Sequence, residues 1–391
     1  MHKIFFLLLI FSFSAFSNEC KLIETTVNYL AQNKLKGRVP ETYGNKQARN
    51  FLKKKLRDLG LKVFEHKFKQ GVNLYATMYP KNARGNKSPE VLLSAHYDGL
   101  DSCDRKLGAG SNICNGAADD AAALAAILAS LTNLKEKIKS PILIIFFDAE
   151  ETGLLGSNAL VKDSKKLNLH LKGLKLMINL DIIGLNLFTG MENTLLAMGG
   201  ETGGKKLLND LNEASKISGL DVYNLSYALT HNRADVSSLI NAKLKVPVIH
   251  LTSGDGSVYH STADEVRYLN QDKISKTSKL VTALTLRALQ SAKKYRFKRP
   301  KMFSGYALPK FTDVKLGKKL IKNTLVNKSL NQFTTSELNQ LKNMIDSLTE
   351  IEKRGKIRFG PKNMQKFANI SFKYMGFSRE MDVIPSGSNC Q

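Results

Sequence analysis

The 391-residue sequence is short of acidic residues, and after its first residues it has no long hydrophobic run. It contains 34 Asp and Glu against 59 Lys and Arg, a formal net charge of +25. This excess raises nucleic acid, an anionic membrane or an acidic polymer as partners, but net charge describes encounter and not chemistry. No later stretch is apolar over the ~20 residues of a membrane span. With 42% hydrophobic and 24% charged residues, the composition excludes a disordered, collagenous or repeat-array chain.

The N-terminus is typical of a secretory signal peptide. A basic start at Lys3 precedes an apolar run from Ile4 to Phe11, and Ala15 and Ser17 are small residues where a signal peptidase reads them. We therefore expect cleavage after Ser17 and a secreted or periplasmic protein. The alternative is an uncleaved amphipathic anchor.

The sequence has only four cysteines, an even number that in an exported protein favours disulfides over a metal site. Three pairings are open. Cys103 and Cys114 lie in one loop rich in Gly, Asn and Ser, while Cys20 and Cys390 lie near the ends of the mature chain, which often meet in compact domains. We expect Cys103 to pair with Cys114, and Cys20 to pair with Cys390.

Short apolar runs alternate with helical patterns along most of the chain. The runs lack alternating polar positions, as buried central strands do, and cover Val91–Ala95, Ile142–Phe147, Leu176–Asn179 and Val246–Leu251. Helical spacing is found over Asp119–Leu134, Lys205–Ser218 and Ile274–Lys294. An amphipathic helix over Asn45–Leu59 and strands over Lys62–Lys69 and Asn73–Tyr79 precede them. The alternation predicts an α/β fold with a helix-covered, largely parallel sheet.

The last quarter of the chain is more basic than the rest. Residues 291–391 contain 21 Lys and Arg and 7 Asp and Glu, whereas residues 1–290 contain 38 and 27. Strand-like runs end near Lys294, and a helical pattern remains over Thr335–Ile351. We therefore divide the chain into a signal peptide (1–17), an α/β domain (18–294) and a basic, partly helical C-terminal extension (295–391).

The extension is expected to bind an anionic surface or polymer. It carries no motif or aromatic and basic interleaving typical of nucleic-acid binding, so no specific nucleic-acid partner is expected. We expect the protein to be a monomer.

Acids and histidines follow the predicted buried strands. The residues are His96 and Asp98, Glu150 and Glu151, Asp181, and further downstream His260. The carboxyl ends of the strands form the ligand crevice of an open α/β sheet, so these side chains can converge there. Carboxylates buried together raise one another's pKa unless a cation compensates them. Histidine nitrogen with carboxylate oxygen suits Zn²⁺, with Mn²⁺ or Co²⁺ as alternatives.

The candidate ligands are too many for one catalytic zinc that keeps an open position. They are His96, Asp119, Glu151, Asp181 and His260. The set fits two metal ions that share a carboxylate and clamp a bridging water, which then attacks a polarised carbonyl. Glu150, next to a ligand, can take the proton of that water as general base. A structural ion-pair network is disfavoured because almost no basic residue is interleaved with the acids.

Five blocks of sequence carry a family resemblance. They are HYD (96–98), GAADDAAA (116–123), FFDAEETGLLGS (146–157), NLDIIG (179–184) and YHSTAD (259–264). In this order they resemble the family-twenty-eight metallopeptidases, the co-catalytic zinc aminopeptidases related to bacterial leucyl aminopeptidase. The resemblance implies a three-layer α/β/α fold with a mostly parallel mixed sheet, two zinc ions per chain, and hydrolysis of N-terminal residues from peptides with a free N-terminus.

The resemblance also implies a role for each residue. His96 and Asp181 would complete one zinc site, Glu151 and His260 would complete the other, and Asp119 would bridge them. Glu150 would be the general base. The role of Glu150 agrees with the reading from the residues alone.

The resemblance also implies roles for four residues outside the ligand set and the base. Asp98 and Asp264 are expected to hold the ligand histidines in the metal-binding tautomer. In RADVSSL (233–239) a Val replaces the His that the family often has, so the oxyanion stabiliser is assigned only to Tyr227 or His231. Outside these sets, His250 is expected to be a hydrogen-bonded core residue and His66 a surface residue.

Other functions are kept as alternatives. Glutaminyl-peptide cyclotransferases share the fold but use a single zinc and a Trp-lined pocket, and this sequence has no Trp. Carboxypeptidase activity on acidic peptides is a second alternative within the family. A surface-binding protein with a vestigial site is a third, which the intact ligand set disfavours.

Overall fold

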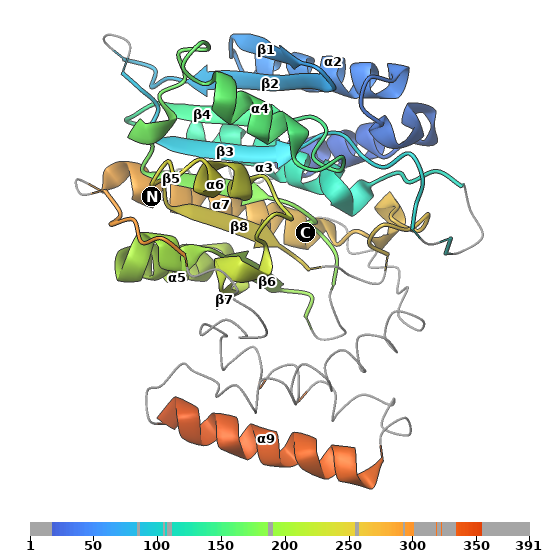
Figure 1. The fold of residues 1–391 in the computed structure, drawn as a ribbon, viewed down its shortest axis with the longest axis vertical. Helices are drawn as coiled ribbons and strands as arrows, with labels where there is room; N and C mark the ends of the chain where they lie inside the picture. The colour runs from blue at the N-terminus through green and yellow to red at the C-terminus, as the bar shows by residue number, and fades with distance from the viewer. Residues whose placement is uncertain are drawn as a thin grey trace, which may run out of the picture.

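The computed structural model describes residues 18–83, 87–104, 106–107, 112–186, 191–254, 258–291, 294–300, 318, 322 and 334–353. Within them an eight-stranded mixed sheet has the order β1-β2-β4-β3-β5-β8-β6-β7 (Figure 1). The strands are β1 (Val63–Phe68), β2 (Gly71–Met78), β3 (Val91–His96), β4 (Ile142–Phe147), β5 (Leu176–Leu180), β6 (Thr194–Met198), β7 (Asp221–Leu225) and β8 (Val248–Thr252). The central strands β4, β3, β5 and β8 run parallel, while β2 and β6 pair antiparallel with β4 and β8.

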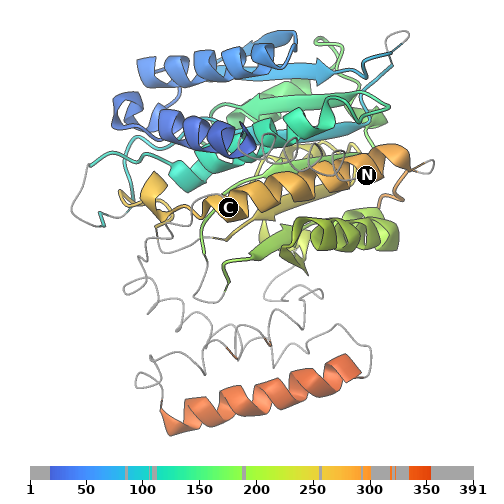
Figure 2. The same ribbon diagram turned by 180° about the vertical axis from the view of Figure 1, so that it is seen from behind.

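Helices cover both faces of the sheet. They comprise a helix over 18–30 together with α2 (Tyr43–Asp58), α3 (Ala122–Leu134), α4 (Leu155–Asp163), α5 (Gly204–Ser218), α6 (Val236–Asn241) and α7 (Gln271–Gln290). Shorter helical turns span Asn33–Arg38, Ala117–Ala121, Leu171–Gly173, Gly200–Gly203, Tyr227–Leu229 and Val266–Tyr268. Helices α4 and α6 lie on one face, and α2, α3, α5 and α7 lie on the other (Figures 1 and 2). The predicted three-layer α/β/α fold is therefore confirmed.

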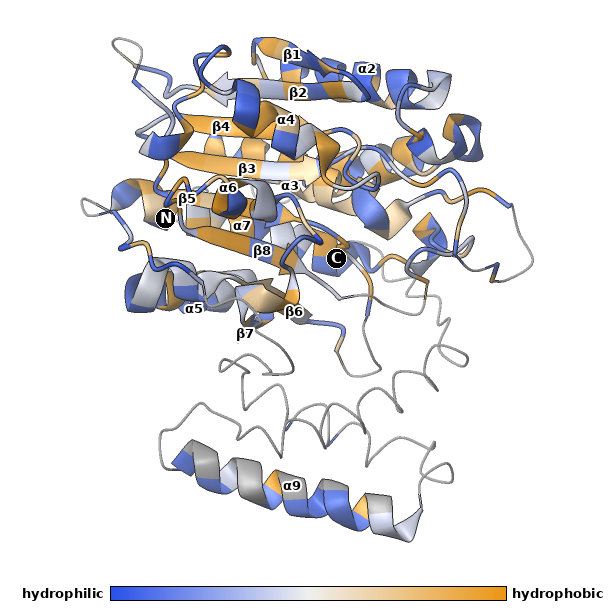
Figure 3. Ribbon diagram, in the orientation of Figure 1, coloured by the Kyte–Doolittle hydropathy of each residue, from blue (hydrophilic) through white to orange (hydrophobic). Residues whose placement is uncertain are grey.

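The central strands are buried on both faces, which explains their lack of polar alternation. In β3, Val91, Leu93 and Ala95 belong to the core beneath α3 and α7, whereas Leu92 belongs to the core beneath α4 and α6. The hydropathy of the ribbon shows the same pattern, with hydrophobic central strands between helices that carry hydrophilic outer faces (Figure 3).

Helix α3 packs close to the sheet because its residues are small. The segment Ala117–Leu134 is long and apolar enough to cross a membrane, yet 89% of it is buried within the protein. It is therefore a core helix, although by length and composition it is an exception to the expectation that no later stretch is apolar enough for a membrane span. Asp119 lies in the turn that leads into α3, so the tight packing of α3 also sets the position of that acid.

The chain stays with the sheet domain for several residues beyond Lys294. The Tyr295 ring is buried, and its hydroxyl donates to Asp210 at 2.9 Å. The Lys298 backbone N–H donates to the carbonyl of Thr202 at 2.7 Å. Helix α9 (Thr335–Lys353) lies apart from the sheet in both views (Figures 1 and 2).

The disulfide between Cys103 and Cys114 is confirmed, with the two Cα atoms 5.5 Å apart. Cys390 lies outside the described residues, so the pairing of Cys20 with Cys390 stays a prediction. The expected signal peptide at 1–17 also lies outside them.

Candidate metal centre

The five candidate ligands converge at the carboxyl ends of the central strands, although they come from five separate segments. His96 ends β3, Glu151 follows β4, Asp181 follows β5, His260 follows β8, and Asp119 lies in the turn before α3. Nε2 of His96 lies 3.0 Å from Oδ1 of Asp119 and 3.6 Å from Oδ1 of Asp181. Nε2 of His260 lies 3.5 Å from Oδ2 of Asp119 and 3.3 Å from Oε2 of Glu151. Asp119 thus directs one carboxylate oxygen toward each histidine.

The donor set fits divalent metal ions. Nε2 of His260 is buried and has no hydrogen-bond partner, although it faces two carboxylates. His96, Asp119 and Glu151 offer nitrogen and oxygen atoms that all lie within 4.8 Å of one another. Neutral imidazole nitrogen with carboxylate oxygen is the ligand chemistry of catalytic zinc.

A sixth residue, Asp120, belongs to the same cluster and was not assigned as a ligand from the sequence. It forms a second group with His96 and Asp181 in which the ligand atoms lie within 4.8 Å of one another. Its Oδ2 accepts the backbone N–H of His96 at 3.2 Å, and its Oδ1 is buried without a partner. Burial raises the pKa of Asp120 well above its usual range. Burial of the charged carboxylate destabilises the folded protein unless a cation lies nearby.

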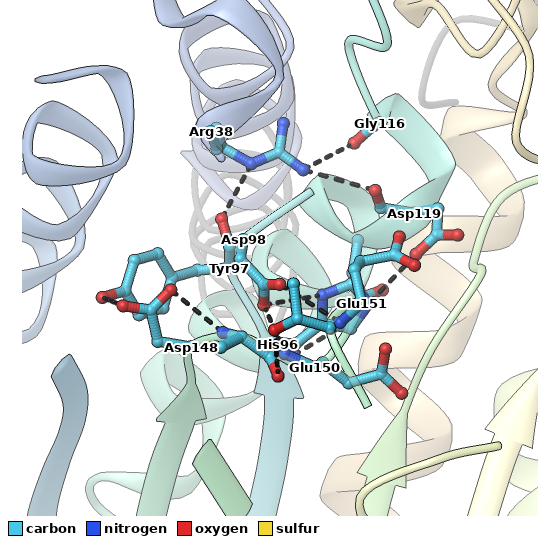
Figure 4. Close-up of polar contacts among 12 residues, drawn as sticks. Arg38, His96, Tyr97, Asp98, Gly116, Asp119, Asp148, Glu150 and Glu151 are labelled. Atoms are coloured by element: carbon cyan, nitrogen blue, oxygen red, sulfur yellow. Dashed lines mark hydrogen bonds and ion pairs between the residues drawn. The ribbon is translucent and has the colours of Figure 1, made fainter. Parts of the chain in front are cut away.

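Glu150 lies beside the ligands and lines the cleft. Burial raises the pKa of its carboxyl well above the usual range, and the negative charges of Asp181, Asp235 and Glu151 act in the same direction. Burial also raises the pKa of Glu151, to about 7. The close-up shows the Glu150 carboxylate pointing away from that of Glu151 (Figure 4). One acid can therefore bind metal while its neighbour remains available for proton transfer.

Asp98 fixes the ligand histidine and the two glutamates together. Its Oδ1 lies 3.4 Å from Nδ1 of His96. The same carboxylate accepts the backbone N–H of Glu150 at 3.0 Å and of Glu151 at 3.2 Å (Figure 4). A carboxylate behind a histidine directs the opposite ring nitrogen toward the metal.

Asp264 acts on the backbone and does not orient a ligand histidine as the sequence analysis expected. Its carboxylate accepts the N–H of Ala118 at 2.8 Å and of Asp119 at 3.2 Å, so it positions the backbone of the candidate ligand Asp119. The carboxylate that faces His260 is instead Asp104, with Oδ2 3.0 Å from Nδ1.

A buried arginine, Arg38, binds the backbone beside the cluster. It was not identified from the sequence. Its guanidinium donates to five backbone carbonyls, those of Leu30, Tyr97, Asn115, Gly116 and Asp119, at 2.6 to 3.3 Å (Figure 4). Because these donors are used on carbonyls, the cluster is not a network of direct arginine–carboxylate pairs. Arg38 instead fixes the backbone that carries two of the ligands.

The backbone around the site adopts conformations that favour glycine. Ala149, Ile182 and His260 have φ values of 57°, 54° and 51°. Such left-handed residues cost about 1–3 kcal/mol each and cluster at functional sites. Here each of them lies within a residue of a ligand or of the base, or is itself a ligand.

A cleft lies above the candidate ligands, with about 440 Å³ of space when the open solvent at its mouth is included. Its described lining comprises Asp119, Glu150, Glu151, Asp181, Ile182, Met198, Leu229, Thr230, Arg233, His250, Thr252 and Tyr259. Neither Tyr227 nor His231 is among these residues, so the assignment of the oxyanion stabiliser to one of them is not supported. Tyr227 is buried in the core beneath α4 and α6, and His231 faces Asn241 at 3.3 Å.

Three aromatic side chains near the site differ in how far the sequence predicted them. The Tyr259 ring stacks on His260 with centroids 3.8 Å apart, a contact that sequence reasoning missed. His250 is buried with Nδ1 3.3 Å from the amide of Asn179, as expected for a hydrogen-bonded core residue, and it also lines the cleft. The expectation that His66 lies at the surface is wrong, because it is buried against Asp163.

Comparison with known proteins agrees with this geometry. The model of peptidase family M28 matches residues 73–285, more than half of the chain. The chain belongs to peptidase family M28. No curated protein matches the chain.

Solved structures place this M28 chain among both peptidases and cyclases. The LapA aminopeptidase of Legionella pneumophila is 18% identical with a TM-score of 0.59, over 72% of this chain and 75% of LapA. The zinc aminopeptidase BSAP of Bacillus subtilis is 15% identical with a TM-score of 0.55, over 71% of this chain and 97% of BSAP. A Tannerella forsythia glutaminyl cyclase is 19% identical with a TM-score of 0.56, over 70% of this chain and 99% of the cyclase. At these identities the likeness extends to the fold.

Proposed function

We propose that the protein is an exported aminopeptidase that holds two zinc ions and removes N-terminal residues from peptides. The observation that carries the proposal is the placement of Asp119 between His96 and His260, with one carboxylate oxygen toward each ring. His96 and Asp181 would complete one zinc site, and Glu151 and His260 would complete the other. A shared carboxylate between two histidine sites is what a pair of co-catalytic metals needs.

The zinc ions, when bound, would polarise the scissile carbonyl and lower the pKa of the attacking water. Glu150 takes the proton of that water and returns it to the leaving amine, because it lines the cleft without being needed as a ligand. Asp98 holds the backbone of Glu150 and so fixes the position of the base.

The cleft also accounts for recognition of a peptide N-terminus. Of the acids that line it, Glu150 is the one not assigned to a metal, and its carboxylate favours a free amine over an acylated one. Ile182, Met198 and Leu229 form an apolar part of the same lining and suit a hydrophobic N-terminal side chain. We therefore propose peptides with a free amine and an apolar first residue as substrates.

Glutaminyl cyclisation is the second candidate, because glutaminyl cyclases are among the structurally similar proteins. A second donor pair, His96 with Asp181, lies beside the other oxygen of Asp119, and this pair favours a second metal over the single zinc of that activity. Metal content therefore separates the two candidates.

The test combines a substrate panel with measurement of bound metal. Fluorogenic leucyl, alanyl, glutamyl and lysyl substrates are compared with their N-acetylated forms, and a glutaminyl peptide is followed for pyroglutamate. We expect cleavage of the free leucyl substrate, loss of activity with a chelator, recovery with zinc, and two zinc ions per chain. One zinc ion together with pyroglutamate formation would show that the protein is a cyclase.

A further inference from the structure

The two ligand histidines have different partners behind their rings. His96 faces Asp98, which is fully buried, whereas His260 faces Asp104, whose side chain is 70% exposed. Oδ2 of Asp104 lies 3.0 Å from Nδ1 of His260, and Nε2 of the same ring faces Asp119 and Glu151. A proton on Nδ1 shared with Asp104 therefore leaves Nε2 free for a metal.

An exposed carboxylate does not hold a histidine well without further restraint. Pairs between solvent-exposed charges contribute little, because the side chain loses conformational freedom and water competes for both groups. Asp98 has no such difficulty, since it is buried and bound to two backbone N–H groups. The position of Asp104 must come from the loop that carries it.

That loop is fastened on both sides of Asp104. The preceding residue, Cys103, is joined by a disulfide to Cys114, which lies five residues before Asp119. On the other side, Leu107 exchanges two hydrogen bonds with the Thr262 hydroxyl, at 3.0 Å through its N–H and 2.9 Å through its carbonyl. The loop is thus tied to the segment of the bridging acid and to the segment of His260.

We propose that Asp104 is a positioning residue for the metal site of His260, and that the Cys103–Cys114 disulfide is the tether that keeps it there. The inference rests on the proposed two-zinc function. It means that the site of His96 is built wholly inside the protein, whereas the site of His260 depends on a disulfide-bonded surface loop. The second zinc is then the more weakly held of the two.

The test measures zinc binding and does not require turnover. Asp104→Asn keeps the shape of the side chain and removes its charge, Asp104→Glu restores the charge, and Cys103→Ser with Cys114→Ser removes the tether. Asp101→Asn is the matched control, because Asp101 is an exposed acid in the same loop. Zinc affinity is measured by calorimetry and stoichiometry by elemental analysis, and the absorption spectrum of the cobalt-substituted protein reports on the geometry of each site.

We expect Asp104→Asn to weaken one of the two zinc sites by about 10–100-fold and to leave the other unchanged. Asp104→Glu should recover part of the loss, and Asp101→Asn should match the wild type. The serine pair should weaken the same site, and adding Asp104→Asn to it should have little further effect. A change in only one component of the cobalt spectrum would distinguish positioning from general destabilisation.

Two results would overturn the inference. Asp104→Asn that binds both zinc ions with wild-type affinity removes the role of Asp104. If Cys103→Ser with Cys114→Ser leaves both zinc affinities unchanged, the disulfide does not hold Asp104 in place. The Asp104→Asn result stands on its own if the double serine variant does not fold. A wild-type protein that binds a single zinc contradicts the two-zinc function itself, and this is seen before any variant is made.

Discussion

Glu150 is the residue on which the chemical step depends most directly. Glu150 lines the cleft, and Asp98 accepts a hydrogen bond from its backbone N–H. The carboxylate of Glu150 therefore remains available to accept a proton. We expect Glu150→Gln to lower kcat by about 10²–10⁴-fold, the usual contribution of a general base, and to leave zinc content unchanged. Steady-state kinetics and elemental analysis test this, with the exposed Glu136→Gln as control. Wild-type turnover in Glu150→Gln would refute the role.

Asp235 makes the metal-free protein sensitive to pH. Burial raises its pKa from 3.8 to about 7, so the folded state binds a proton that the unfolded state has released. The stability due to the neutral carboxyl is therefore present below the unfolded pKa and is lost as pH rises through about 7. We expect Asp235→Asn to gain stability relative to the wild type over this range.

Urea unfolding of both proteins in chelator at several pH values tests this expectation. A stability difference between the two proteins that stays constant from about pH 4 to about pH 8 would contradict it.

At the level of elements, helix α3 couples packing to the placement of a ligand. Its alanines are buried against the sheet and α7, and Asp119 lies in the turn that leads into it. Ala126→Leu adds volume where there is no room, so we expect a loss of about 1–3 kcal/mol in the free energy of unfolding and weaker zinc binding. Thr132→Leu, at an exposed position of the same helix, should change stability by less than about 0.5 kcal/mol. Calorimetry in chelator and zinc titration measure both effects. Equal stabilities for the two variants would contradict the argument.

The elements that the sequence predicted are those with a strong local pattern. The uniform apolar runs of β3, β4, β5 and β8 reflect burial on both faces, and the long helices α2, α3, α5 and α7 have clear helical spacing. Strands β6 and β7 and helices α4 and α6 were not predicted. Helices α4 and α6 are only nine and six residues long, and β7 begins with partly exposed residues, so none shows a full period.

The same distinction between local and long-range patterns decides which site residues could be predicted from the sequence. Ligands that follow a buried strand could be found from the sequence, because the ends of parallel strands meet at one edge. Arg38 and Asp104 could not be found in this way, because their partners are distant in the sequence. The long-range partners of Arg38 lie 59 to 81 residues away, and His260 lies 156 residues from Asp104. No periodic pattern signals a contact that depends only on how loops return to the sheet.

For the whole molecule, the charge is unevenly distributed along the chain. Residues 301–391 contain 16 Lys and Arg against 7 Asp and Glu, a net charge of +9. Residues 18–300 contain 42 against 27, a net charge of +15 spread over about three times the length. The buried acids of the candidate metal centre are counted in the net charge of residues 18–300, although they do not lie at the surface. The extension is therefore the denser positive segment, and we propose that it binds anionic polymers.

The structure fixes where this extension should be removed. Because Tyr295 and Lys298 contact α5 and the turn before it, truncation at Lys294 would damage the domain, whereas truncation after Pro300 spares these contacts. The truncation also removes Cys390, the expected partner of Cys20. We therefore expect the chain ending at Pro300 with Cys20→Ser to keep the melting temperature and peptidase activity of a full chain with Cys20→Ser and Cys390→Ser, and to elute from a heparin column at a lower salt concentration than that full chain. Binding through released counterions has this dependence on salt.

The matched control separates the position of the charge from its amount. A chain of residues 18–391 with nine exposed lysines of residues 18–300 changed to Gln has the same net charge as the chain of residues 18–300, +15. If the extension is the binding segment, this variant elutes close to the wild type and well after the truncated chain. If both proteins elute together, binding follows total charge, and the extension has no special part in it.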